Sequence, residues 1–183
     1  MIYTIQNEFL TVRVEDLGAQ LSSIQAPDGT EYLWQGDPDI WARRAPILFP
    51  FIARLRENTY YLDGQPYAIS THGFARDMVF SLADQGEDHI SLQLTDTPET
   101  RKVNPFTFSL TVTYTLEKNR LKKSHRVENR SDKDMYYELG AHDGFRAPVE
   151  PGVPMSSWSI RLPGVERVQF YGMDESCTLT PKG

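Results

Sequence analysis

The chain has 183 residues, 39% of them hydrophobic and 24% charged, with a formal net charge of −6. This length is enough to bury a hydrophobic core, and we expect one domain over residues 1–183. The acidic balance argues against nucleic acid as a partner, because proteins that bind phosphate backbones normally present a basic face. One basic cluster, at residues 120–126, is interpreted as the solvated face of a strand.

Cysteine use and hydropathy indicate where the protein resides. The single cysteine, Cys177, excludes an internal disulfide framework and is typical of a reducing compartment. Residues 1–8 lack the basic segment and apolar run of a signal peptide. No apolar stretch approaches the roughly 20 residues that a membrane helix needs. We therefore expect a cytoplasmic protein that does not enter a membrane.

Apolar residues recur mostly with a period of two, which predicts strands with one buried face. In chain order, the strand-like segments are residues 9–15, 90–94 and 106–114. Residues 37–43 are the best helical candidate, a turn or two with Asp37 as its cap.

Turn dipeptides separate these segments. Asp28-Gly29 and Asp63-Gly64 supply the positive φ of tight turns, and residues 59–67 are predicted to form a hairpin. Pro66 should lie at an edge or at the start of its strand, because it has no N–H for a ladder. The predicted fold class is all-β, a large antiparallel β-sandwich rather than a barrel.

Residues 45–56, with the sequence APILFPFIARLR, form an apolar run that ends on arginine. One interpretation is a buried strand whose final arginine reaches solvent. The other is that the strand delivers Arg54 to the rim of a pocket.

Two histidines have similar neighbours: residues 71–77 read THGFARD and residues 140–146 read GAHDGFR. Histidine is the best proton donor or acceptor near neutral pH, arginine offers a fork of donors, and an aromatic ring can pack against a sugar. His89 and His125 are interpreted as surface residues. No spacing of histidines or cysteines supports a metal site, and there is neither a serine-hydrolase elbow nor a glycine-rich phosphate loop.

Residues 176–180 have strand character, and the sequence then stops at Gly183. An open strand edge is rarely left uncovered. We therefore expect either that another chain covers this edge, which allows a dimer, or that the sequence is the N-terminal part of a longer protein.

Taken in order, these segments resemble the aldose 1-epimerase (galactose mutarotase-like) family, and within it the LacX-like branch. The resemblance rests on PILFP with Arg54-Leu55, on HGFARD at 72–77, on ELGAH at 138–142, and on LGAQLSSI at 17–24 with YLW at 32–34. It implies a large antiparallel β-sandwich and an isomerase that interconverts the α and β anomers of a hexose by ring opening. It implies neither a metal nor an organic cofactor.

The resemblance also implies roles for single residues. His142 corresponds to the general acid and His72 to a histidine that binds the sugar and helps polarise it. Arg54 corresponds to an arginine that contacts substrate oxygens. Arg76 corresponds to an arginine that holds the phosphate in the branch that acts on hexose 6-phosphates. With these we take Asp77 and Phe74 as candidate substrate-binding residues.

Four departures from the family pattern matter. Ala53 and Asp143 replace a glycine and a proline, and Thr71 replaces a glutamine of the sugar-phosphate branch, which favours an unphosphorylated hexose. The glutamate that acts as the general base in the family has no counterpart before Gly183. We therefore expect little mutarotase activity from this polypeptide alone, and carbohydrate binding without catalysis, or a role as an interaction domain, is the alternative function.

Overall fold

A computed structural model describes residues 1–150, 152–169 and 172 of the chain. Its two main sheets are antiparallel: one has the order β1-β2-β3 and the other the order β10-β9-β8-β7. The strands of the first are β1 (Ile2–Gln6), β2 (Thr11–Glu15) and β3 (Leu21–Gln25). Those of the second are β7 (Ser81–Gln85), β8 (His89–Thr95), β9 (Phe108–Glu117) and β10 (Arg120–Asn129).

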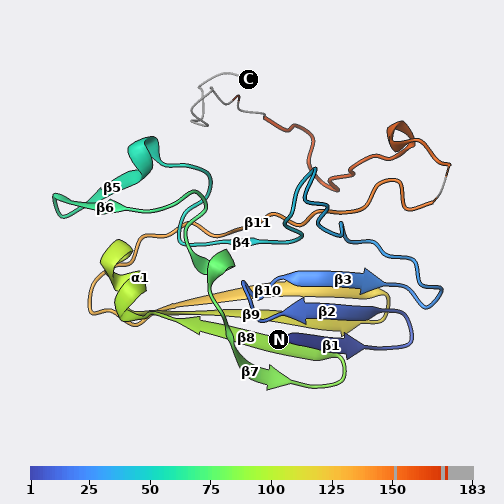
Figure 1. Cartoon of the computed structure of the whole chain (residues 1–183), viewed down its shortest axis with the longest axis horizontal. Coiled ribbons are helices and arrows are strands. Elements are labelled where there is room, and N and C mark those ends of the chain that lie inside the picture. Colours follow the sequence, from blue (N-terminus) through green and yellow to red (C-terminus); the bar gives the residue numbers. More distant parts are fainter. Residues whose placement is uncertain (151, 170–171, 173–183) are drawn as a thin grey trace.

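Alternation of apolar residues places one face of each sheet in the core. In β8, Ile90 and Leu92 are fully buried, and they lie opposite Tyr114 and Val112 of β9. In the other sheet, Val12 of β2 pairs with Ile5 of β1 and with Ile24 of β3, and it is also fully buried. Buried side chains from both sheets form one cluster, and the sheets overlap face to face in Figure 1. The predicted antiparallel β-sandwich is confirmed.

Two small sheets lie beside the sandwich, on the side of β3 and β10 (Figure 1). One pairs β4 (Ile47–Leu48) with β11 (Gly140–Ala141), and the other pairs β5 (Thr59–Leu62) with β6 (Gln65–Ala68). The second is the predicted hairpin, with Asp63 and Gly64 at φ 50° and 77° in its turn. Pro66 lies in a two-stranded sheet, where every strand is an edge.

The helical expectation was only partly correct. Within residues 37–43 only residues 38–40 form a turn, which is closed by the Trp41 N–H donating to Asp37 O at 2.7 Å. Within the described ranges the one α-helix is α1 (Pro98–Val103), which the periodicity did not indicate. Thr97 and Thr100 cap it reciprocally, and Pro98 occupies the first turn. Six residues are too few for an apolar period of 3.6 to stand out.

Two further expectations concern the strand near the C-terminus and membrane-spanning helices. Residues 176–180, with the open edge expected there, lie outside the described residues. Of the helices that the structure describes, none is long and apolar enough to cross a membrane.

Candidate functional site

The apolar segment after Ala45 is buried and supports the segments that carry the two histidines. Ile47 and Leu48 pair with β11, and Phe49 is fully buried. The carbonyl oxygen of Phe49 accepts hydrogen bonds from the N–H groups of Phe74 and Ala75, at 3.0 and 3.2 Å. The segment that carries HGFARD is thereby fixed against the strand that leads to Arg54.

Gly73 makes this close approach possible. Its φ is 72°, and a Cβ at this position would lie 2.2 Å from the carbonyl oxygen of Phe49. No other residue type avoids both the clash and the left-handed backbone penalty. The glycine therefore brings the preceding residue, His72, over the end of the strand.

His72 is bound to Ala53 at two points. Its N–H donates to Ala53 O at 2.9 Å, and its ring Nδ1 accepts from the Ala53 N–H at 2.9 Å. A ring whose Nδ1 accepts carries its hydrogen on Nε2 when it is neutral. Partial burial, then the positive charges of Arg76, His142 and Arg43, lower the pKa of His72 below its ordinary value. His72 therefore presents a neutral Nε2–H donor at neutral pH.

His142 follows β11 and reaches the same place. Its N–H donates to Pro46 O at 3.1 Å, and its side chain is exposed. The His142 and His72 rings lie edge to face, with centroids 6.4 Å apart. Trp41 also packs against His142, with ring centroids 5.0 Å apart, and the backbone oxygen of Trp41 accepts from the indole N–H of Trp34. The two histidines, distant in sequence, form one site.

Arg76 and Asp77 adjoin the histidine pair. Arg76 is 17% exposed, its Nη2 donates to Thr71 O at 2.7 Å, and its Nε lies 3.5 Å from an Asp77 oxygen. The other Asp77 oxygen accepts from Arg43 at 2.9 Å. One carboxylate thus bridges two guanidinium groups beside His72.

Trp41 and Arg43 are site residues that the sequence did not reveal. Both lie in residues 37–43, which were considered only as a helix candidate. Aromatic and basic residues near a predicted turn are too common to single them out. Their contacts with His142 and Asp77 depend on how distant segments pack.

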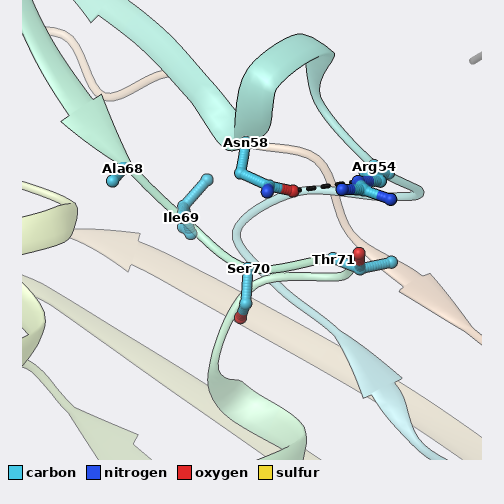
Figure 2. Close-up of a pocket in the computed structure, with 6 residues that line it drawn as sticks. All are labelled: Arg54, Asn58, Ala68, Ile69, Ser70 and Thr71. Carbon is cyan, nitrogen blue, oxygen red and sulfur yellow. Dashed lines mark hydrogen bonds between the residues drawn. The ribbon is translucent and has the colours of Figure 1, made fainter. Parts of the chain in front are cut away.

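Arg54 directly follows Ala53, the residue that is hydrogen-bonded to His72. Its Nε donates to Asn58 Oδ1 at 3.1 Å (Figure 2). It borders a shallow hollow of about 470 Å³, whose other lining residues are Asn58, Ala68, Ile69, Ser70 and Thr71. Thr71 connects the hollow to the histidine pair, because it precedes His72 and its oxygen binds Arg76. β4 ends at Leu48, so the expected strand does not extend to Arg54, and a loop brings Arg54 to the border of the hollow. A contact of Arg54 with substrate stays a prediction.

Phe74 makes core contacts instead of facing an open surface. Its half-buried ring packs against Phe49 and Phe108, with centroid distances of 6.2 and 6.1 Å. These contacts anchor the HGFARD segment to the sandwich, so a contact of Phe74 with substrate stays a prediction.

Two surface interpretations need correction. His125 is half-buried on the inward side of β10, and its Nε2 is shielded from solvent. In the basic cluster, Lys123 is 12% exposed and binds Asp143 at 2.8 Å. Alternation alone did not reveal this, because the partner carboxylate comes from the loop after β11.

Groups of three or more metal-ligating side chains are not found among the residues that the structure describes.

Comparisons with known proteins agree on one family. The family model described as aldose 1-epimerase matches residues 1–166. Protein LacX (chromosomal) of Lactococcus lactis is 36% identical over an alignment of 172 residues, which covers 91% of this chain and 58% of that protein. The plasmid-encoded LacX matches to the same extent. The chain thus spans less than two thirds of the length of the curated relatives it matches.

Solved structures give the same result. A galactose mutarotase related enzyme from Lactobacillus acidophilus superposes with a TM-score of 0.82 at 39% identity, covering 84% of this chain and 52% of that one. A galactose mutarotase-like protein from Lactobacillus casei has a TM-score of 0.78 at 36% identity, covering 79% and 50%.

Proposed function

The chain belongs to the aldose 1-epimerase family, and we propose that it carries the sugar-binding and acid-bearing part of a mutarotase site. The reaction interconverts the α and β anomers of a hexose by opening and reclosing its ring. Opening needs an acid at the ring oxygen and a base at the anomeric hydroxyl. The convergence of His72 and His142, with ring centroids 6.4 Å apart, is the observation that carries the proposal.

The two imidazoles differ in surroundings, which supports different roles. His72 has its Nδ1 occupied by Ala53 and a lowered pKa, so it suits hydrogen-bond donation to a sugar oxygen from a neutral ring. His142 is exposed and packs against Trp41, so its ring can meet a ligand and exchange protons with solvent. We assign sugar positioning to His72 and protonation of the ring oxygen to His142.

The charges and donors of the arginines indicate which substrate the site could bind. Arg76 and Arg43 share Asp77, which leaves one net positive charge in that group beside the histidines. Arg54 borders the adjoining hollow. Hydroxyl oxygens of an uncharged hexose fit these donors, and a hexose 6-phosphate is the alternative substrate.

A second candidate function is carbohydrate binding without turnover. The carboxylates adjoining the pair among the described residues, Asp77 and Asp143, are both engaged by cations. Neither is placed as a base that faces substrate. For this polypeptide alone we therefore expect binding, with slow anomer exchange or none.

Polarimetry of freshly dissolved α-galactose, combined with an NMR titration of the chain by the same sugar, tests both functions. Acceleration above the buffer rate that falls about 100-fold or more in His142→Ala supports the mutarotase, since general acids typically contribute ~10²–10⁴-fold. Binding that perturbs His72 and His142 without acceleration supports the second candidate. His89→Ala, outside the site, is the control. If neither galactose nor glucose nor their 6-phosphates bind, both functions are wrong.

A further inference from the structure

Asn58 lies in a short turn that ends just before β5. Its φ is 51°, a left-handed conformation that asparagine adopts more readily than most residues. Its N–H donates to Leu55 O at 2.9 Å, and its carbonyl oxygen accepts from the Ile69 N–H at 2.8 Å. Because the backbone is held on both sides, the direction of the Asn58 Cα–Cβ bond is fixed.

The Asn58 side chain binds Arg54 through one hydrogen bond. Asn58 Oδ1 accepts from Nε at 3.1 Å, and Figure 2 shows this contact at the border of the hollow. A guanidinium has five N–H donors, and this contact uses one of them. Among the described residues no hydrogen bond from the Arg54 Nη atoms is found. The two amino groups are therefore available to a ligand.

We infer that Asn58 is a positioning residue that orients Arg54 over the hollow for binding to sugar hydroxyl oxygens. The inference rests on the proposed function, because it assigns the ligand of Arg54 to that site. A free arginine samples many rotamers, and a ligand that must select one binds more weakly. Holding Nε to Asn58 removes much of that freedom before the ligand arrives.

Three variants separate the side chain from the backbone of the turn. Asn58→Gly keeps the positive φ and removes the acceptor, so the turn is preserved. Asn58→Asp keeps an acceptor oxygen at the same position. Glu57→Gly is the matched control, because Glu57 has a φ of 55° in the same turn, is exposed, and makes no hydrogen bond with Arg54.

The first readout needs no ligand. The Arg54 Hε resonance in ¹H–¹⁵N spectra should exchange slowly with water in the wild type, Asn58→Asp and Glu57→Gly, and rapidly in Asn58→Gly. Equal exchange in the wild type and Asn58→Gly would overturn the inference, whether or not any sugar binds.

The second readout is the dissociation constant for D-galactose from the same spectra. Asn58→Gly should bind about tenfold more weakly, the scale of a lost charge-assisted hydrogen bond, and Asn58→Asp should stay within about threefold of wild type. In an Arg54→Ala background, Asn58→Gly should have no further effect. Wild-type affinity in Asn58→Gly contradicts the inference alone, whereas absence of galactose binding by every variant contradicts galactose as the ligand of the proposed site.

Discussion

At the scale of single residues, the two nitrogens of His72 have separate tasks. Nδ1 is occupied by the Ala53 N–H, so Nε2 carries the hydrogen that can meet a ligand. Protonating Nδ1 would break that contact and place a charge beside Arg76, the second cause, after burial, of the lowered pKa of His72. The backbone contact and the arginine thus favour the same neutral tautomer.

This arrangement gives a pH-dependence with a defined sign. Because the folded pKa of His72 is lowered from 6.5, the unfolded chain takes up the proton first as pH falls. The free energy of unfolding should therefore decrease as pH falls from about 6.5 through the folded pKa. Denaturant unfolding at a series of pH values should show a shallower decrease in His72→Asn, a variant chosen because asparagine tolerates the φ of 66° found at His72 and retains an acceptor.

His89 provides an internal contrast. Hydrogen bonds to Asp88, and then to Asp84, raise the pKa of His89. The stability that protonated His89 contributes to the fold is therefore present below pH 6.5 and is lost as pH rises through the folded pKa. An NMR titration resolves the two imidazoles. A pKa of 6.5 or higher for His72, or a hydrogen on its Nδ1, would contradict the interpretation.

Gly73 and Gly64 form a natural comparison. Their φ angles are 72° and 77°, but a Cβ would contact Phe49 O at 2.2 Å in the first case and meet nothing within 4 Å in the second. Gly64→Ala should cost only the left-handed backbone penalty, about 1–2 kcal/mol. Gly73→Ala should destabilise the fold by well over that, because the backbone at Phe49 has to move. Equal losses in urea melts would contradict the assignment.

At the scale of elements, one ion pair connects β10 to the loop that follows β11. Lys123 and Asp143 are 12% and 22% exposed and lie 2.8 Å apart. Asp143 comes directly after His142, so the pair ties the proposed acid's loop to the four-stranded sheet. The ammonium also lies 5.8 Å from the centroid of the Tyr114 ring, which forms part of its surroundings.

A double-mutant cycle measures this connection. Lys123→Met and Asp143→Asn should each destabilise the fold, with a coupling energy of about 1–2 kcal/mol, because each partner is left half-buried without its counter-charge. Arg126 and Glu128 make the matched control: they lie 2.8 Å apart on β10 but are 76% and 35% exposed. Their coupling should be about 0.5 kcal/mol or less. Equal coupling in the two pairs, from chemical denaturation, would contradict the argument.

At the scale of the whole molecule, the two sheets are joined by apolar packing and by one buried hydroxyl. Tyr114 of β9 is fully buried, and its O–H donates to Ala19 O, between β2 and β3, at 2.8 Å. Burial, with the nearby Asp143, raises the pKa of Tyr114 well above its usual range, so the phenol remains a donor.

Tyr114→Phe tests how much this contact contributes. The ring still fills the core, but Ala19 O loses its partner, and we expect a loss of about 1–2 kcal/mol in the free energy of unfolding. Tyr61→Phe, on an exposed side chain of the hairpin, should change it by about 0.5 kcal/mol or less. A loss in Tyr114→Phe no larger than in Tyr61→Phe would mean that the hydroxyl does not help to join the sheets.

The sequence by itself determined three of the strands (β2, β8 and β9), the β5–β6 hairpin and the family. Alternation in residues 90–94 and 106–114 and the turn at Asp63-Gly64 are local signals, because strand period and turn geometry depend on neighbours in the chain. The family resemblance selected both histidines. Only the tertiary structure decided that the two rings meet, that Trp41 and Arg43 join them, and that Lys123 is paired with Asp143. These contacts depend on how segments distant in the sequence pack together, and local sequence patterns do not predict such packing.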